Sequence, residues 1–525
     1  MVEFAVEFAR RERVLLWVLG LATLASTVAQ IWCQESNLVM AFGDAKSRML
    51  LARQVTDSVN PGLAQLGAIW PVLPQLTALP FVWVNGLFYS GLAGALPQSI
   101  SYVGTCGLLF LLEREVTRRT APGVVAVFVY SVPNMLFLQA VPMSESMFNL
   151  GFVGAVYFFY RWIRAQERWI LLVATEPFIV IASQTRYEGW VLFILFSCIL
   201  LGLWRSRLLY SAEARAKATV FVFWPGLTTL LWLSYNWVYY HNPLYFLVSD
   251  YSASSIVKEA VAHAPKAYSS QGDLLKSLLV YTRTVADIAG VPILLFSLVG
   301  LTMFVVSARG WSEKAAMLVL LFPFPFFVYS LWAGGSVEIW HPYYTGGANW
   351  GTRYGVLMLP PVAIFSGYVF VNIRGALENG IRAAFAVSLA FTWAGGVLSA
   401  GEARQNRDNP QAVAQLAAGR WLRTAYDGGE VLLQRFQNET TIIESRVPLS
   451  RVVSEAAPRD LYQENLRYPV PQVRWVLTKR DAVTNNYDGV GTSVLKNPDF
   501  DRTFQPVYDD GQTQIWRRVT SLAGQ

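Results

Sequence analysis

The chain has 525 residues, of which 54% are hydrophobic and only 15% are charged. Because soluble domains carry about 25% charged residues, this composition excludes a typical soluble enzyme, a disordered chain and a disulfide-rich scaffold. The formal charge is +7, and three cysteines are too few for a disulfide framework. Their spacing also gives no indication of a metal site. We therefore expect a protein that spends most of its length in a bilayer.

Apolar runs predict about eleven transmembrane helices, since a span needs about 20 residues. We expect the first run to be a span and not a cleavable signal peptide, because its core is long, no small-residue cleavage site flanks it and further spans follow. The spans are predicted near residues 14–33, 93–112, 122–140, 146–160, 169–185, 189–203, 220–240, 289–306, 316–332, 355–373 and 383–400.

The distribution of positive charge predicts the topology. With the N-terminus in the cytoplasm, the six inside segments carry 17 Lys and Arg residues, and the five outside segments between spans carry 9. This excess is what the positive-inside rule requires. The net positive charge therefore reflects membrane topology, and no nucleic-acid partner is predicted.

The composition changes sharply after residue 400, where charged residues, Asn and Pro become frequent. An odd number of spans places this tail outside the cytoplasm. We predict a transmembrane domain over residues 1–400 and a small extracytoplasmic α/β domain over 401–525, with a helix at 411–426. Its short β-rich runs include Glu430–Gln434, Gln472–Thr478 and Gln514–Val519.

The first predicted outer loop holds an acid followed by two cations, Asp44, Lys46 and Arg48. Met49, Ala52 and nearby leucines recur at helical spacing, which predicts an amphipathic helix on the membrane with Asp44 as its cap. The alternative is that these three residues take part in catalysis. Asp44 would be a general base, and Lys46 with Arg48 would bind a phosphate.

Two further polar clusters lie at predicted outer span ends. Ser144 and Glu145 lie between the third and fourth spans. Ser144 is a candidate cap of the fourth helix, and an acid such as Glu145 is favourable in a first helical turn. Arg186 and Glu188 lie in the short turn Thr185–Trp190, where they either compensate each other or hold a lipid phosphate. A carboxylate such as Glu145 is also well placed to contact a sugar.

A fourth cluster lies on the loop before the tenth span. His341 and Arg353 would together form a phosphate clamp, among aromatic residues that otherwise anchor at membrane interfaces. Glu176, inside the fifth span, is either a functional acid or a protonated or hydrogen-bonded one. The candidate sugar- or acceptor-binding residues are Glu188, Trp340, Tyr344, Trp350 and Tyr354.

These features, in this order, resemble the GT-C superfamily of membrane glycosyltransferases. More narrowly, they are similar to its polyprenyl-phosphate-sugar-dependent members, of the protein mannosyltransferase and aminoarabinose transferase type. The resemblance rests on the spans, the first-loop motif Gly43–Asp44, the helix after it, the Thr-Arg-x-x-Gly turn at 185–189 and the C-terminal domain. It implies an α-helical polytopic membrane enzyme. Asp44 then matches the family's catalytic acid.

The resemblance also implies an inverting transfer that needs no metal cofactor. Asp44 would deprotonate the acceptor, and the leaving lipid phosphate would be held by cations. The candidate phosphate ligands are Lys46, Arg48, Arg186, His341 and Arg353. Many protein mannosyltransferases have Asp-Glu at the first-loop motif, whereas Ala45 follows Asp44 here. Glu145 or Glu188 is then the candidate second carboxylate.

The expected donor is a polyprenyl-phosphate-linked sugar, with a mannose-like hexose expected first. The run at residues 142–146 resembles one in the mannosyltransferases of glycolipid-anchor assembly. The acceptor is a glycan, a lipid or a protein, membrane lipids surround the chain, and a bacterial inner membrane is the expected location. One alternative is an O-antigen-ligase-like or polymerase-like enzyme that uses a lipid diphosphate. The other is a lipid or sugar transporter, which would carry polar residues through the bundle.

Overall fold

The computed structural model describes residues 12–205, 212–263, 270–334, 339–345, 349–372, 376–456, 459–480 and 488–519. The chain divides into two compact units that are each discontinuous in sequence. Unit 1 comprises Met1–Ser36, Ala68–Pro74 and Ala95–Glu402, and unit 2 comprises Asn37–Gly67, Gln75–Gly94 and Ala403–Gln525. The sequence prediction placed a single boundary after residue 400. Unit 2 additionally contains two segments that lie between the first two predicted spans.

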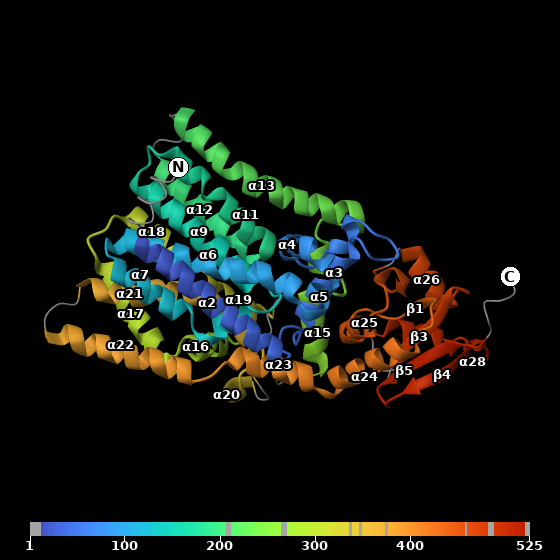
Figure 1. The fold of residues 1–525 in the computed structure, drawn as a ribbon. Coiled ribbons are helices and arrows are strands. Elements are labelled where there is room, and N and C mark those ends of the chain that lie inside the picture. The colour runs from blue at the N-terminus through green and yellow to red at the C-terminus, as the bar shows by residue number, and fades with distance from the viewer. Residues whose placement is uncertain are drawn as a thin grey trace, which may run out of the picture. The chain divides into compact units, whose positions relative to one another are not determined.

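Unit 1 is built from helices, drawn from blue to orange in Figure 1. The long helix α13 (Ala212–Tyr240) lies beside α11 (Glu176–Thr185) and α12 (Glu188–Trp204). The helices of unit 1 are α2 (Arg13–Glu35), most of α6 (Leu92–Thr117), α7 (Thr120–Tyr130), α8 (Pro133–Leu138), α9 (Glu145–Arg164), α10 (Trp169–Val173), α11 (Glu176–Thr185), α12 (Glu188–Trp204), α13 (Ala212–Tyr240), α14 (Tyr245–Val248), α15 (Ala253–His263), α16 (Leu274–Ala289), α17 (Val291–Val306), α18 (Trp311–Leu318), η2 (Val319–Leu321), α19 (Pro323–Ala333), α20 (Pro342–Thr345), η3 (Thr352–Met358), α21 (Leu359–Asn372), α22 (Ala376–Ala394) and the first half of α23 (Leu398–Asp408).

Five helical segments of the described chain are long and apolar enough to cross a membrane, and seven if each of two bent pairs counts as one span. The five are Arg13–Glu35, Leu92–Thr117, Arg215–Tyr240, Thr352–Val371 and Glu378–Asp408. The bent pairs fall at the predicted spans 289–306 and 316–332, and shorter apolar helices occupy Thr120–Tyr130, Trp169–Thr185 and Glu188–Trp204. The structure thus fits a polytopic membrane protein, and the number eleven stays a prediction.

Small residues bring α9, α11 and α12 into close contact. A Cβ atom added to Gly151 of α9 would lie 2.5 Å from the backbone nitrogen of Ala182 in α11. A Cβ atom added to Gly189 of α12 would lie 2.3 Å from the carbonyl carbon of Ala182. Helices in membranes associate through such close backbone approach. As a result, the first residues of α9 and α12 lie next to the end of α11.

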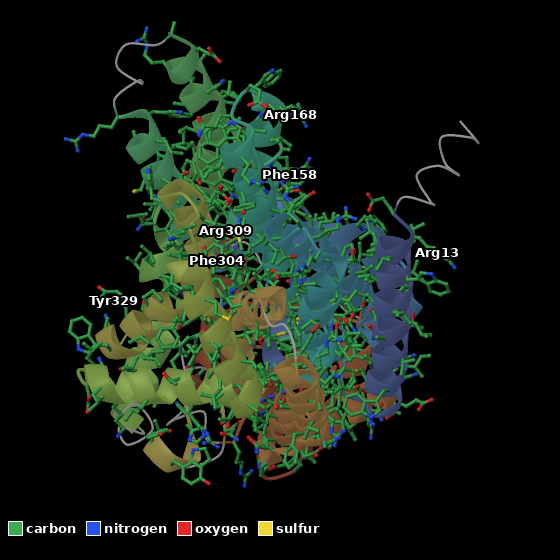
Figure 2. All side chains as sticks on the ribbon, turned by 90° about the vertical axis from the view of Figure 1, so that its left-hand side faces the viewer. Arg13, Phe158, Arg168, Phe304, Arg309 and Tyr329 are labelled. Atoms are coloured by element: carbon green, nitrogen blue, oxygen red, sulfur yellow. The ribbon has the colours of Figure 1, made fainter. Side chains whose placement is uncertain are left out.

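Charged residues of the predicted inside segments form a network of their own. Arg309, labelled in Figure 2, donates to the Tyr160 hydroxyl at 3.1 Å and to Glu313 at 3.2 Å. Its guanidinium lies 5.7 Å from the centre of the Phe304 ring, which is labelled beside it. Tyr160 in turn donates to Glu313 at 2.9 Å. These contacts join the end of α9 to the start of α18.

Unit 2 combines helices with a five-stranded sheet of order β2-β1-β3-β5-β4. The first three strands of that order pair in parallel and the last three are antiparallel, with Val431 opposite both Val452 and Trp475. The strands and helices are α3 (Gly43–Gln54), η1 (Leu63–Leu66), α4 (Leu73–Val82), α5 (Asn85–Ser90), α24 (Pro410–Ala425), β1 (Glu430–Leu432), α25 (Glu439–Ser445), η4 (Leu449–Arg451), β2 (Val452–Val453), α26 (Arg459–Arg467), β3 (Val473–Lys479), α27 (Gly489–Val494), α28 (Phe500–Thr503), β4 (Phe504–Asp509) and β5 (Thr513–Arg518).

The helix predicted after Asp44 exists, but its expected surroundings and cap are wrong. Helix α3 begins at Gly43, its N-cap is Phe42, and Asp44 lies in its first turn. Met49, Leu50 and Ala52 are buried in a hydrophobic core that also contains residues of α24, α25 and the sheet. The apolar face of α3 is therefore covered by protein within unit 2 rather than by a membrane surface.

Candidate active site

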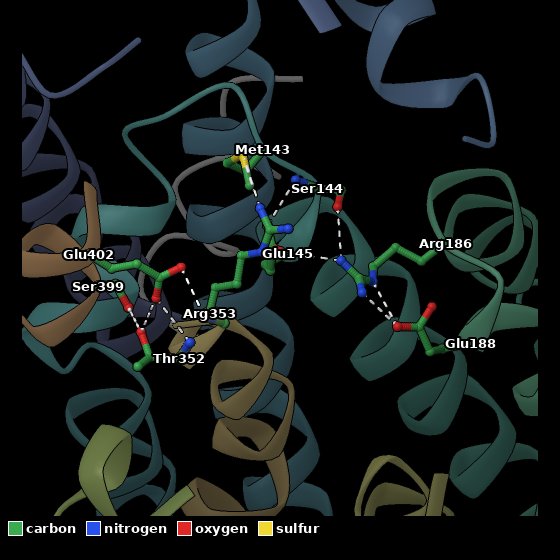
Figure 3. Close-up of polar contacts among 10 residues, drawn as sticks. Met143, Ser144, Glu145, Arg186, Glu188, Thr352, Arg353, Ser399 and Glu402 are labelled. Atoms are coloured by element: carbon green, nitrogen blue, oxygen red, sulfur yellow. Dashed lines mark hydrogen bonds and ion pairs between the residues drawn. The ribbon is translucent and has the colours of Figure 1, made fainter. Parts of the chain in front are cut away.

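The site in unit 1 is built around the Arg186 side chain, which follows the last residue of α11. Its Nε and Nη2 atoms donate to Oε1 of Glu188 at 3.0 and 2.6 Å. Its Nη1 atom donates to the Ser144 hydroxyl at 3.1 Å and to Oε1 of Glu145 at 3.2 Å (Figure 3). Three elements therefore meet at one guanidinium. The two carboxylates come from the first residues of α9 and α12.

These charges are withdrawn from solvent. The side chains of Glu145, Glu188 and Arg186 are 1%, 7% and 14% exposed. Burial by itself lowers the pKa of Arg186, but the charges of Glu188 and Glu145 outweigh it and hold the pKa above its usual value. Arg186 is thus a permanent cation shared by two buried carboxylates.

A second guanidinium approaches the same carboxylate. The Nε atom of Arg353 lies 3.9 Å from Oε1 of Glu145, and its Nη1 atom lies 3.9 Å from the sulfur of Met143. The Tyr354 ring is shared by both cations, because its centre lies 5.4 Å from Cζ of Arg186 and 5.2 Å from Cζ of Arg353. Tyr354 therefore stabilises a paired arginine site through cation–π contacts.

The charge of this site is balanced, since two arginines face two glutamates. Arginine binds a phosphate through two parallel N–H···O bonds. All three guanidinium nitrogens of Arg186 already donate to protein groups. Arg186 has five N–H donors, and four hydrogen bonds to protein groups engage them. A phosphate that accepts two parallel N–H bonds from Arg186 must therefore displace at least one of these acceptors. The sequence prediction brought Arg186 and Glu188 together within one turn, and the structure adds Glu145, Arg353 and Tyr354 to them.

His341 is engaged with a residue that the sequence analysis did not identify. The Nδ1 atom of His341 accepts a hydrogen bond from the backbone N–H of Tyr343 at 3.3 Å, so the ring proton is on Nε2. The Nε2–H group then donates a hydrogen bond to the Asp287 carboxylate at 3.1 Å. Asp287 also pairs with Arg283 at 2.8 Å. Asp287 had no sequence signal, because it lies 54 residues before its partner on the last turn of α16. The Tyr344 ring lies 5.4 Å from that of His341.

Trp340 and Trp350 form an isolated antiparallel bridge. Each backbone N–H donates to the other's carbonyl, at 2.9 and 3.2 Å, and the rings lie 5.8 Å apart. These two predicted sugar-binding aromatics therefore pair with each other, and Trp350 lies three residues before Arg353 in the chain.

Glu176 is fully buried, and neither of its carboxylate oxygens has a hydrogen-bond partner among the described residues.

Asp44, Lys46 and Arg48 belong to unit 2. Burial lowers the pKa of Lys46, while the carboxylates of Glu439 and Glu444 act in the opposite direction. The Ser47 hydroxyl donates to Glu439 at 3.0 Å. Arg48 is 8% exposed, and its Nη1 lies 3.4 Å from the side-chain oxygen of Gln75. Lys46 and Arg48, predicted as phosphate ligands, thus also hold α3 within its unit.

Replacing Lys46 by Met is expected to lower the free energy of unfolding by about 1–3 kcal/mol, because Glu439 and Glu444 lose a nearby cation. Thermal unfolding of the purified protein in detergent measures this change. Lys496→Met is the matched control, since Lys496 is exposed in the same unit. If Lys46→Met kept full stability while the KM for a lipid-phosphate donor rose, Lys46 would be a phosphate ligand and not a structural cation.

Among the residues that the structure describes, no group of three or more His, Cys, Asp or Glu side chains is arranged to hold a metal ion. No family model matches the chain, and no curated protein matches it by sequence. Similarity is found among solved structures.

ArnT from Cupriavidus metallidurans, solved with undecaprenyl phosphate bound, is similar over 98% of this chain and 99% of its own, with a TM-score of 0.58 and 12% identity. An oligosaccharyltransferase from Archaeoglobus fulgidus, tethered to an acceptor peptide, matches 98% of this chain and 75% of its own, with a TM-score of 0.51 and 12% identity. AglB from the same archaeon, in complex with an inhibitory peptide and a dolichol-phosphate, has a TM-score of 0.51, with 11% identity and coverage of 94% and 73%.

The chain shares its fold with these solved proteins, so the resemblance stated from the sequence is confirmed at the level of the fold. The chain also has several helices that are long and apolar enough to cross a membrane, which fits an integral membrane protein.

Proposed function

We propose that this protein is a glycosyltransferase that moves a sugar from a polyprenyl monophosphate to an acceptor. The observation that carries the proposal is the fold shared over nearly the whole chain with ArnT, a protein solved with undecaprenyl phosphate. Arg353 of unit 1 supports it, because a guanidinium group suits a phosphate leaving group. The donor sugar is a mannose-like hexose, and the acceptor is a glycan, a lipid or a protein.

At the anomeric carbon the transfer breaks one bond and forms one, with inversion, while a proton moves from the acceptor hydroxyl to Asp44. Asp44 takes the proton of the acceptor hydroxyl, whose oxygen attacks the anomeric carbon from the face opposite the phosphate. The bond between that carbon and the phosphate oxygen breaks, and polyprenyl phosphate leaves. Fixed positive charge at the leaving oxygen is the main expected source of rate. No metal is required by this scheme.

We assign the leaving phosphate to Arg353. His341 is not assigned to it, because its Nε2–H donates to Asp287 and its Nδ1 accepts from the backbone N–H of Tyr343. Arg186 instead holds Glu145 and Glu188, since its nitrogens already donate to them and to Ser144. The reaction is proposed to occur on the extracytoplasmic face of a bacterial inner membrane, with residues 401–525 on that side.

A donor panel tests this proposal. Purified protein is given short-chain polyprenyl monophosphates carrying different hexoses, and separately a lipid-diphosphate glycan, each with and without EDTA. We expect turnover of one monophosphate donor that persists in EDTA. Consumption of the lipid diphosphate alone would favour the ligase-like enzyme. If the protein instead moved a labelled lipid or sugar across vesicle membranes without consuming it, a transporter would replace the enzyme.

A further inference from the structure

A buried carboxylate holds the turn that precedes Arg353. Oε1 of Glu402 accepts from the backbone N–H of Gly351 at 3.0 Å. Oε2 accepts from the backbone N–H of Thr352 at 3.0 Å and from the Thr352 hydroxyl at 2.8 Å (Figure 3). Both side chains are almost fully buried, with Glu402 4% and Thr352 5% exposed. One carboxylate therefore fixes two consecutive peptide units.

The turn needs such a partner for a physical reason. Gly351 has φ of 70°, and the 3₁₀ helix η3 begins at the next residue, Thr352. The first N–H groups of a helix have no acceptor within the helix, and their positive end favours a carboxylate. The hydroxyl of Thr352 also lies 3.3 Å from that of Ser399, whose backbone N–H donates to Asn134. The Glu402 carboxylate is thus itself part of an anchored, buried network.

This network holds Thr352, the residue directly before Arg353 in the chain. The Arg353 guanidinium interacts electrostatically with Glu402. Its contact with Glu145 and its position against the Tyr354 ring both depend on the course of the backbone through this turn. A shift of about 1 Å in a positioning element is enough to impair a phosphate contact.

From these contacts we propose that Glu402 is a positioning residue, which sets Arg353 against the lipid phosphate without touching the donor itself. The inference rests on the proposed function, because it assumes that Arg353 binds the phosphate. It extends that function to a residue outside the predicted phosphate and sugar sites. Glu402 lies just beyond the last predicted span, in the segment that the sequence analysis assigned to the C-terminal domain.

Binding of a short-chain polyprenyl phosphate to the full-length protein in detergent, measured by calorimetry, tests the proposal. In Glu402→Gln the amide offers one acceptor oxygen, so the two N–H groups cannot both keep their separate partners. We expect the Kd to rise about 10-fold or more. Thr352→Val, which removes the hydroxyl that donates to Glu402, should also raise the Kd. Thr352→Ser keeps a hydroxyl and should bind like the wild type. The exposed Asp408→Asn, on the same helix, should bind like the wild type.

A double variant separates positioning from general loss of structure. If Glu402 acts through Arg353, Glu402→Gln should add little to the loss already caused by Arg353→Gln, whereas independent effects would add. In turnover, the KM for the lipid-phosphate donor should rise while the KM for the acceptor stays unchanged. Should Glu402→Gln fail to fold, the Val and Ser variants of Thr352 decide the question.

Three results would overturn the proposal, and they are distinguishable. Wild-type binding that neither Glu402→Gln nor Thr352→Val weakens would remove the positioning role and leave the proposed function intact. Losses from Glu402→Gln and Arg353→Gln that simply add would do the same. Absence of polyprenyl phosphate binding by the wild-type protein would remove the proposed function, and the inference with it.

Discussion

Replacing Asp44 by Asn is expected to leave the protein folded and to slow sugar transfer by about 10²–10⁴-fold, the usual contribution of a general base. The amide has the same shape as the carboxylate but cannot take the acceptor's proton. Helix α3 should survive the change, because Met49, Leu50 and Ala52 anchor it in the core of unit 2. Transfer rate and thermal unfolding of the same preparation measure both expectations.

Asp57→Asn is the matched control for Asp44→Asn. Asp57 lies in the same predicted loop, where it pairs with Arg53 at 3.3 Å and accepts from the backbone N–H of Ser450 at 3.1 Å. Its loss should leave transfer unchanged, since nothing assigns it to the reaction. Wild-type turnover by folded Asp44→Asn would remove Asp44 from the mechanism. An equal loss in both variants would point to the structure of the loop instead.

Replacing Arg186 by Gln is expected to destabilise the protein by about 3–5 kcal/mol, the usual cost of removing one partner from a buried ion pair. Glu145 and Glu188 are 1% and 7% exposed, and both would lose their shared counter-charge. Unfolding in detergent, followed by tryptophan fluorescence, measures the loss. Arg283→Gln makes the same chemical change at a side chain that is 43% exposed. It should cost less than about 1 kcal/mol.

The double variant Arg186→Gln with Glu188→Gln should recover much of the stability that the single variant loses, because one of the two stranded carboxylates becomes neutral. A single Arg186→Gln variant as stable as the wild type would show that Arg186 does not hold these carboxylates in the folded protein. Arg186 would then return to the set of phosphate ligands that the sequence predicted.

Local signals in the sequence predicted much of the molecule. The helix predicted at 411–426 occurs as α24 at Pro410–Ala425, and the run Gln472–Thr478 is met by β3 at Val473–Lys479. The Thr-Arg-x-x-Gly turn placed Arg186 beside Glu188, and the structure explains its glycine. Gly189 has no room for a Cβ atom against α11.

What the sequence could not predict depends on contacts between distant residues. The apolar face of α3 has the same pattern whether a bilayer or a protein core covers it, so its burial in unit 2 was not predictable. Glu145 is 41 residues from Arg186, and Asp287 is 54 residues from His341. Glu402 was missed because its partners include backbone N–H groups, which every residue but proline carries.

The most direct test of the account is the product balance of a single reaction. Purified wild-type protein is incubated with a polyprenyl-phosphate hexose and an acceptor in EDTA, and released polyprenyl phosphate and glycosylated acceptor are quantified together. We predict equal amounts of the two products, an inverted anomeric configuration in the new glycoside, and loss of both products in Asp44→Asn. Glycosylated acceptor formed from a lipid diphosphate while the monophosphate donor stays intact would contradict the account.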